Sequence, residues 1–361
     1  MNPGLDIDEI LRRTVEMNAS DLHLAAGLVP VVRVFGNLID MEGMPRLMPQ
    51  DIEDLIIPIL SPSQREKLEH NLELDFSYSL PKVSRFRGNI MWQRSSMAVN
   101  FRTVAMNIPR LTDLNLPPAV AELGRLPRGL VLVTGPTGSG KSTTLAALIS
   151  QINEENRLNI ITIEDPIEYL HSHKKSMIKQ REVGGDTLSF ASALRHALRH
   201  DPDVILVGEM RDLESIQIAI TAAETGHLVF STLHTQTAAL AVNRIIDVFP
   251  SHMRNQICQQ LAGSLQGIVA QQLISRKDGK GRVAAVEILL STPAVRNLIR
   301  EGKEHQLYSV MQTGRAAGMQ TMDQALADLF AKGLISREAA MEYCVDQAEL
   351  ERALRKSAFD F

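Results

Sequence analysis

A glycine-rich segment that ends in a lysine and a hydroxyl residue is the feature of this sequence most suited to chemistry. Residues 135–142 read GPTGSGKS and match the pattern G-x-x-x-x-G-K-[ST]. The segment follows an apolar run at 130–134 and opens a helical pattern at 143–152, which is the strand–loop–helix context that the pattern requires. We therefore predict a phosphate-binding loop whose backbone N–H groups and helix N-terminus bind the phosphates of a nucleotide.

The residues of this loop have different predicted tasks. Lys141 is expected to reach the β- and γ-phosphates of ATP, and the hydroxyl of Ser142 is expected to ligate Mg²⁺. A glycine-rich turn without a ligand is the alternative, which the combination of strand, lysine, hydroxyl and helix disfavours. The loop alone indicates a superfamily and not an activity. The predicted nucleotide-binding residues are Gly135, Pro136, Thr137, Gly138, Ser139, Gly140, Lys141, Ser142 and Thr143.

An acidic residue follows each of two further apolar runs. Glu209 comes just after the run at 204–207, an arrangement typical of a buried strand that delivers a carboxylate toward Mg²⁺ and water. Glu164 comes just after the run at 159–163. We expect Glu164 to orient the attacking water and Glu209 to lie on the Mg²⁺ side, although the reverse assignment also fits the sequence. An ordinary helix-capping acid is the alternative interpretation of Glu209.

Two histidines, His227 and His234, flank the apolar run at 228–232. A single histidine at a strand end is more often a structural or surface residue than a catalytic one. Because it follows a phosphate loop and two acidic strands in the chain, we interpret His234 as a sensor of the γ-phosphate. A metal site formed by these histidines is not expected, since no third ligand lies at a suitable spacing.

The elements that must position these residues differ along the chain. Residues 1–107 mix short alternating runs with helical patterns, and residues 108–128 contain four prolines and are predicted to be a linker. Residues 129–292 alternate continuous apolar strands with helices, which predicts a parallel α/β sheet. Residues 293–361 have a helical pattern, in which Thr321 and Gln324 have the spacing of a capping box.

Composition limits the classes of protein that this chain can belong to. The net charge is −4 and aromatic residues make up 4%, which argues against nucleic acid as a partner. The two cysteines, Cys258 and Cys344, predict neither a disulfide framework nor a cysteine-rich zinc site. No apolar run approaches the roughly 18 residues that span a bilayer, and no secretory signal is recognisable at the N-terminus. The expected location is the cytoplasm.

Four segments in this order resemble the conserved boxes of secretion and pilus ATPases. They are the phosphate loop, TIEDPIE at 162–168, LRHDPDVILVGEMRD at 198–212 and TGHLVFSTLHT at 225–235. The segment ASDLHL at 19–24 is similar to the start of the small N-terminal domain of these proteins. The segment AVRNLIRE at 294–301 resembles the C-terminal signature of the type IV pilus retraction ATPases, the PilT family, with Val295 in place of isoleucine.

The resemblance implies an architecture and a function. Residues 1–107 would form a PAS-like α+β domain, residues 129–292 a RecA-like ATPase core, and residues 293–361 a helical subdomain. The chain would form a homohexamer that hydrolyses ATP with Mg²⁺ and powers pilus retraction and twitching motility. Arg87 and Arg102 match positions from which such ATPases reach a neighbour's nucleotide. The implied partners are an inner-membrane platform protein of the pilus and a paralogous retraction ATPase, at the inner face of the cytoplasmic membrane.

Three alternatives remain at this stage. A pilus-assembly or type II secretion ATPase commonly carries a four-cysteine zinc insertion, which two cysteines cannot form. An accessory retraction ATPase is separated less decisively by the segment at 294–301. A RecA-like nucleic-acid translocase would be expected to show a basic channel or stacking aromatic residues.

Overall fold

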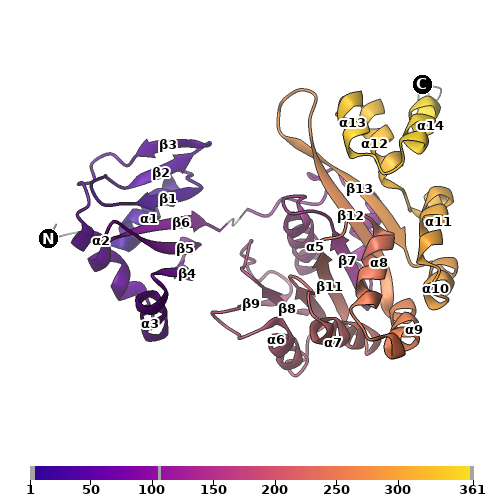
Figure 1. Ribbon diagram of the computed structural model, residues 1–361, viewed down its shortest axis with the longest axis horizontal. Helices are drawn as coiled ribbons and strands as arrows, with labels where there is room; N and C mark the ends of the chain where they lie inside the picture. Colours follow the sequence, from indigo (N-terminus) through magenta and orange to yellow (C-terminus); the bar gives the residue numbers. More distant parts are fainter. Residues whose placement is uncertain (1–4, 105–106, 358–361) are drawn as a thin grey trace. The chain divides into compact units, whose positions relative to one another are not determined.

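The computed structural model describes residues 5–104 and 107–357, and the chain forms two compact units (Figure 1). The first unit comprises Met1–Asn107 and the second comprises Ile108–Phe361. Each unit contains one β-sheet.

Six antiparallel strands form the sheet of the first unit, in the order β3-β2-β1-β6-β5-β4. Residues of β5 (Ser84–Gln93) alternate between two environments, because Phe86 and Ile90 are buried whereas Arg87 is exposed. Phe101 on β6 (Ser96–Thr103) packs edge-on against Phe86, with ring centroids 6.4 Å apart. One face of the sheet therefore forms a core with the helices, and the other carries polar side chains. The remaining elements are α1 (Ile7–Glu16), β1 (Asp21–Leu24), β2 (Val31–Val34), β3 (Asn37–Asp40), α2 (Pro49–Ile56), η1 (Ile57–Ile59), α3 (Pro62–Asn71) and β4 (Glu73–Leu80).

Seven strands form the sheet of the second unit, in the order β13-β12-β7-β11-β10-β8-β9. All neighbouring strands are parallel except the pair β12 and β13, and β13 forms one edge. The predicted strands at 130–134, 159–163, 204–207 and 228–232 correspond to β7, β8, β10 and β11. The strands of this sheet are β7 (Gly129–Thr134), β8 (Asn159–Glu164), β9 (Met177–Glu182), β10 (Val204–Val207), β11 (Leu228–Leu233), β12 (Leu265–Ser275) and β13 (Arg282–Leu290).

Helices cover both faces of this sheet, as expected for parallel strands that are apolar on both sides. On one face, Leu148 and Ile152 of α5 (Lys141–Glu155) pack against Val131 of β7 and its neighbours. On the other face, Ile220 of α7 packs against strand residues that include Ile205. The helices of that second layer are α6 (Phe190–Ala197), α7 (Leu213–Glu224), α8 (Ala238–Asp247) and α9 (Arg254–Ser264).

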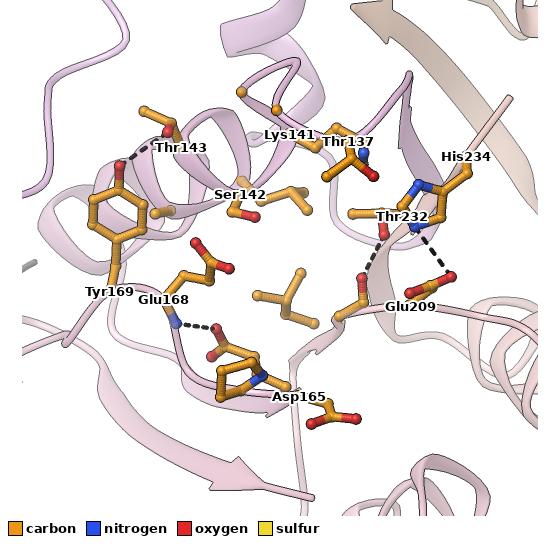
Figure 2. Close-up of a pocket in the computed structure, with 18 of the residues that line it drawn as sticks. Thr137, Lys141, Ser142, Thr143, Asp165, Glu168, Tyr169, Glu209, Thr232 and His234 are labelled. Atoms are coloured by element: carbon orange, nitrogen blue, oxygen red, sulfur yellow. Dashed lines mark hydrogen bonds and ion pairs between the residues drawn. The ribbon is translucent and has the colours of Figure 1, made fainter. Parts of the chain in front are cut away.

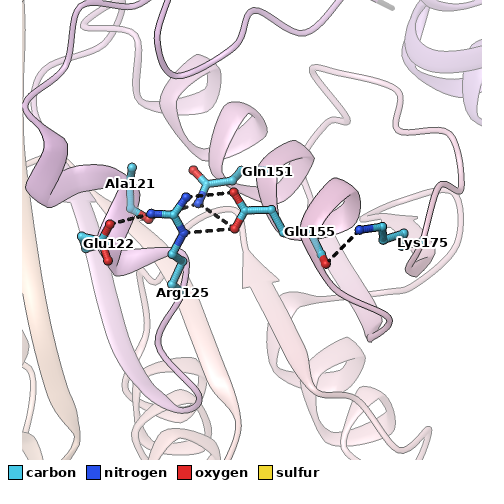
Figure 3. A network of polar contacts seen from close by, with 6 residues as sticks. All are labelled: Ala121, Glu122, Arg125, Gln151, Glu155 and Lys175. Carbon is cyan, nitrogen blue, oxygen red and sulfur yellow. Dashed lines mark hydrogen bonds and ion pairs between the residues drawn. The ribbon is translucent and has the colours of Figure 1, made fainter.

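The segment predicted as a linker, 108–128, lies within the second unit. It contains the short helix α4 (Pro118–Leu123), whose Val120 is fully buried in the core on the α5 side. Arg125 links two helices, as Figure 3 shows. Its guanidinium donates to Glu122 of α4 at 2.5 Å and to Glu155 of α5 at 3.0 Å and 3.1 Å. These contacts fix the C-terminal part of the segment to α5, the helix that follows the phosphate loop.

The chain from 293 onward is helical in its described part. Thr321 and Gln324 form the predicted capping box at the start of α12, which confirms that local signal. Among the described helices, none is long and apolar enough to cross a membrane. The helices are α10 (Pro293–Arg300), α11 (Leu307–Thr313), α12 (Met322–Ala331), α13 (Arg337–Tyr343) and α14 (Gln347–Ser357).

Candidate active site

The phosphate loop connects β7 to α5 at the carboxyl end of an inner strand. Gly135, Gly138 and Gly140 have φ angles of 141°, 79° and 89°, a region of backbone space that favours glycine. A Cβ on Gly138 would meet no heavy atom within 4 Å, so the backbone there is open to a ligand. Gly140 is the N-cap of α5, and the first helical residue is Lys141. The loop therefore presents peptide N–H groups at a helix N-terminus, which is the arrangement that binds phosphate.

Lys141 folds back over its own loop. Its Nζ donates to the carbonyl oxygens of Gly135 and Pro136 at 2.9 Å and 3.0 Å. Burial lowers the pKa of Lys141, and the carboxylate of Glu209 opposes that shift. Because both present acceptors are neutral carbonyls, the ammonium can move to phosphate oxygens without giving up an ion pair.

The three hydroxyl residues that follow Lys141 have different surroundings. The side chain of Ser142 lines a cavity beside the loop, as Figure 2 shows. The Oγ1 of Thr143 lies 2.9 Å from the hydroxyl of Tyr169. The Oγ1 of Thr144 donates to Gln271 at 2.8 Å and is buried. Ser142 and Thr143 line the cavity, whereas Thr144 does not.

Glu164 ends β8 and lies at the wall of the same cavity. Its Oε1 accepts hydrogen bonds from Thr162 Oγ1 at 2.6 Å and from Gln180 Nε2 at 3.2 Å. Burial raises the pKa of Glu164 even though these hydrogen bonds act in the opposite direction. A carboxylate with a raised pKa is a stronger acceptor for the proton of a water molecule than an ordinary glutamate.

Glu209 follows β10 and has a different environment from Glu164. Its Oε1 lies 2.6 Å from Arg211 Nε and 3.2 Å from His234 Nε2, and Figure 2 shows the second contact. Burial alone would raise the pKa of Glu209, but its contacts with Arg211 and His234 outweigh burial and lower it. Glu209 therefore stays ionised next to the cavity.

The cavity has a volume of about 470 Å³ and gathers residues from four loops at the carboxyl edge of the sheet. Gly135, Pro136 and Ser139 do not line it: Gly135 and Ser139 lie against Gln271, and the Pro136 carbonyl accepts Lys141. The predicted site residues that line the cavity are Thr137, Gly138, Gly140, Lys141, Ser142, Thr143, Glu164, Glu209 and His234.

Fourteen further lining residues were not predicted as site residues, and four of them are Glu168, Tyr169, His171 and Arg211. Figure 2 shows Glu168 extending toward Ser142, with Tyr169 beside Thr143. Burial lowers the pKa of His171 to about 4, so its imidazole is neutral at pH 7. The fourth is Arg211, the partner of Glu209. Glu168 and Arg211 belong to the acidic segments at 162–168 and 198–212, where the pattern of acids following strands was the only available signal, whereas Tyr169 and His171 follow the first segment.

A second cavity adjoins the first on the other side of the phosphate loop. Its volume is about 420 Å³, and Gly140 and Thr143 line both cavities. Residues 113–116 of the proline-rich segment and Arg276 of the β12–β13 connection line the second cavity. Together the two spaces extend along the loop and the start of α5, farther than phosphates alone would need.

The two predicted trans arginines lie on the polar face of the sheet in the first unit. Arg87 on β5 and Arg102 on β6 are paired directly across the two strands. Arg102 Nε also donates to Asp21 Oδ1 at 2.9 Å, and this aspartate is its register partner on β1. Burial alone would raise the pKa of Asp21, but hydrogen bonds from Ser20 and Arg102 lower it. The sheet thus presents a row of two arginines and one carboxylate.

The oxygen atoms of the site suit Mg²⁺ bound together with a nucleotide. Across the residues that the structure describes, no group of three or more His, Cys, Asp or Glu side chains is arranged to hold a metal ion. A hydroxyl from Ser142 and the carboxylate of Glu209 face the cavity instead. Mg²⁺ is usually held by one or two protein oxygens and by substrate phosphates, so this donor set fits.

Comparisons with known proteins place the chain in a family. Residues 91–342 match the family described as "Type II/IV secretion system protein". The chain is 51% identical to the "Type IV pilus retractation ATPase PilT" of Pseudomonas aeruginosa over 94% of its own length and 98% of that protein. The chain belongs to the PilT family of type II/IV secretion system proteins. The chain is also 40% identical to the "Type IV pilus ATPase PilU" of the same organism, over 97% of this chain and 92% of PilU.

The similarity to the PilT family extends to three dimensions. The fold matches the "Crystal Structure of the Pilus Retraction Motor PilT and Bound ADP" with a TM-score of 0.88 and 51% identity, over 96% of this chain and 99% of that one. A mixed α/β fold shared with PilT is therefore established for the chain. The predicted family resemblance is confirmed.

Proposed function

We propose that this chain is an ATP-hydrolysing motor that powers the retraction of type IV pili and hence twitching motility. The observation that carries the proposal is the phosphate loop, whose Lys141 and Ser142 open into a cavity walled by Glu164 and Glu209. This phosphate loop occurs in a chain that is 51% identical to a pilus retraction ATPase over nearly its whole length. The crystal structure of the related PilT contains bound ADP, which supports a nucleotide as the ligand of the cavity.

In this proposal the residues of the cavity divide the work of phosphoryl transfer. Lys141 leaves the carbonyls of its own loop and binds the β- and γ-phosphates, while Glu164 orients the attacking water and accepts its proton. The bond from the γ-phosphorus to the bridging oxygen breaks, and ADP and phosphate leave. His234 contacts Glu209 and reports whether the γ-phosphate is present. Mg²⁺ would be held by Ser142 on the side of the cavity where Glu209 lies. When bound, it would neutralise charge on the phosphate oxygens.

The second cavity is proposed to take the nucleoside end of ATP. It shares Gly140 and Thr143 with the phosphate cavity and is lined by residues 113–116 of the proline-rich segment. Occupation by the nucleoside would connect nucleotide binding to residues 113–116, near the start of the second unit. The domains assigned to the chain are a PAS-like domain at 1–107, a linker at 108–128, a RecA-like core at 129–292 and a helical subdomain at 293–361.

The motor is proposed to be a homohexamer in which Arg87 and Arg102 reach the nucleotide of a neighbouring subunit. An arginine supplied across an interface stabilises charge on the transferring phosphoryl group and couples hydrolysis to movement between subunits. The ion pair with Asp21 orients Arg102, whose side chain is still 62% exposed. The ring would act at the inner face of the cytoplasmic membrane on a platform protein of the pilus, together with a paralogous retraction ATPase and without nucleic acid.

The experiment that tests the proposal measures ATP turnover, the native mass of the particle and pilus-dependent twitching. Purified chain should hydrolyse ATP as a particle near six times 40.0 kDa, at a rate that DNA and RNA leave unchanged. Expression in a P. aeruginosa strain lacking PilT should restore twitching, and expression of the Lys141→Ala variant should not. Hydrolysis that requires nucleic acid would contradict the proposal. Restoration of a strain lacking only PilU would favour the accessory role, against the higher identity to PilT.

A further inference from the structure

The phosphate loop is held from behind by a side chain of another strand. Gln271 lies on β12 directly after Ala270, the last residue of that strand paired with β7. Since β12 continues past the end of β7, Gln271 comes to lie beside the first residue of the loop. A Cβ on Gly135 would approach the carbonyl oxygen of Gln271 to 2.2 Å, which shows how closely the loop packs on this strand.

The carboxamide of Gln271 bonds to both ends of the segment that contains Lys141. Its Nε2 donates to the carbonyl oxygen of Ser139 at 2.7 Å, and its Oε1 accepts from Thr144 Oγ1 at 2.8 Å. Gln271 is 3% exposed, Ser139 3% and Thr144 1%, so water cannot replace either bond without a change in structure. A carboxamide is suited to this position because it carries a donor and an acceptor side by side.

Gly140 and Gln271 also fit each other sterically. A Cβ on Gly140 would lie 2.7 Å from Gln271 Nε2, in addition to the strain of a side chain at a φ of 89°. The glycine therefore leaves the space in which the amide group of Gln271 reaches the Ser139 carbonyl. The orientation of the peptide between Ser139 and Gly140 depends on this contact, and its N–H is one of the groups that a phosphate loop offers to phosphates.

We propose that Gln271 is a positioning residue for nucleotide binding, which acts by fixing the peptide groups at 139–140 and the first turn of α5. The inference rests on the proposed function only in that the ligand of the loop is a nucleotide. Gln271 does not line the phosphate cavity, whereas it lines the second cavity together with Thr144. Both polar atoms of its carboxamide are engaged by Ser139 and Thr144, so its effect on the phosphates passes through the loop backbone and through Thr144.

The test measures the affinity of purified variants for a fluorescent ADP analogue, together with their melting temperature without nucleotide. Gln271→Met keeps the length of the side chain and removes both hydrogen bonds, so we expect affinity to fall about tenfold or more. Gln272→Met is the matched control, because it changes the same residue type on the same strand with the side chain on the other face of the sheet. The control should bind ADP as the wild type does.

Substitutions of the partner residue separate positioning from general stability. Thr144→Val removes the hydroxyl that Gln271 accepts from and should weaken binding, whereas Thr144→Ser keeps the hydroxyl and should restore most of the affinity. Gln271→Glu retains the volume but places a carboxylate beside the Ser139 carbonyl, and it replaces Gln271→Met if that variant does not fold. Wild-type ADP affinity in a folded Gln271 variant would overturn the proposal. So would weaker binding that Gln272→Met shares to the same extent.

The readout separates this proposal from the proposed function. If the wild-type chain binds ADP but does not hydrolyse ATP, the motor proposal fails while the ADP affinities still decide the role of Gln271. If hydrolysis is intact and Gln271→Met has an unchanged ADP affinity, the motor proposal stands and the positioning role is refuted.

Discussion

His234 Nε2 lies 3.2 Å from Glu209 Oε1, so residues that follow the neighbouring strands β11 and β10 form one polar pair at the edge of the cavity. Arg211 binds the same oxygen at 2.6 Å. The two cationic or hydrogen-bonding partners keep the pKa of Glu209 below its usual value in spite of partial burial. A ligand that attracted His234 would therefore also change the environment of Glu209.

Replacing His234 should affect turnover more than nucleotide binding. In His234→Ala the contact with Glu209 and the proposed contact with the γ-phosphate are both lost, so we expect kcat to fall at least tenfold while the affinity for ADP changes less than threefold. Steady-state hydrolysis and ADP titration measure the two quantities. His227→Ala is the control, because that histidine sits at the other end of β11 and contacts the carbonyl of Ala222. Equal losses in the two variants would argue against a sensor role.

The opposite pKa shifts of Glu164 and Glu209 predict which of them governs activity at low pH. A water-orienting carboxylate must be ionised, and burial raises the pKa of Glu164 whereas the pKa of Glu209 is lowered. The kcat should therefore fall as pH decreases through a value above 4.5, the ordinary pKa of glutamate. Glu164→Gln should lower kcat about a hundredfold or more and abolish this acid limb. An acid limb that survives in Glu164→Gln would transfer the role to another group.

The role of Ser142 can be tested through the dependence on metal concentration. Ser142→Ala removes the hydroxyl that faces the cavity, so the Mg²⁺ concentration for half-maximal hydrolysis should rise about tenfold. Thr143→Val is a useful comparison, because it removes the neighbouring hydroxyl, which contacts Tyr169. That variant should leave the Mg²⁺ dependence within about twofold of wild type. A similar shift in both variants would mean that the hydroxyl of Ser142 has no special relation to the metal.

Mixed rings test whether Arg87 acts in a neighbouring active site. Arg87→Ala and Glu164→Ala subunits should each be nearly inactive alone, because each lacks one part of a composite site. Mixing them should restore part of the turnover, since some interfaces then combine an intact Arg87 with an intact Glu164. Mixing Glu164→Ala with Lys141→Ala provides the control, because both of those residues line the same cavity. Absence of recovery in the first mixture, with native rings confirmed by mass, would remove the trans role.

A buried acid outside the site gives a prediction for stability. Glu287 on β13 is fully buried and accepts the backbone N–H of Ala238 at 2.7 Å, and burial raises its pKa from 4.5 to about 7. The folded protein therefore holds a proton that the unfolded chain releases near pH 4.5, so its contribution to stability decreases as pH rises from 4.5 to 7. The shift corresponds to roughly 3 kcal/mol.

The variant Glu287→Gln cannot ionise, so its free energy of unfolding should change less between pH 5 and pH 8 than that of the wild type. Denaturant titrations at several pH values measure the difference, which should grow in favour of the variant as pH rises. The pKa of the nearby Asp323 is also raised by burial, and its charge contributes to the raised pKa of Glu287, so the comparison reports the loss of Glu287 together with its coupling to Asp323. Parallel pH profiles for the two proteins would show that Glu287 does not titrate in this range.

Local sequence was sufficient wherever a feature depends on neighbouring residues. The loop at 135–142 could be predicted from the spacing of its glycines. Gly135, Gly138 and Gly140 adopt positive φ angles, which glycine allows locally without help from distant residues. The capping box of Thr321 and Gln324 is likewise a contact across three residues. Continuous apolar runs predicted four buried strands of the parallel sheet.

Contacts between distant segments were decided by the tertiary structure. The strands β12 and β13 were not predicted, yet β12 pairs with β7 and brings Gln271 to the phosphate loop, 132 positions from Ser139 in the chain. Strand order arises from the packing of whole elements, and short apolar runs do not encode which strand will lie beside which. For the same reason the sequence placed Glu209 and His234 in one nucleotide site without predicting their contact, which the pairing of β10 with β11 brings about.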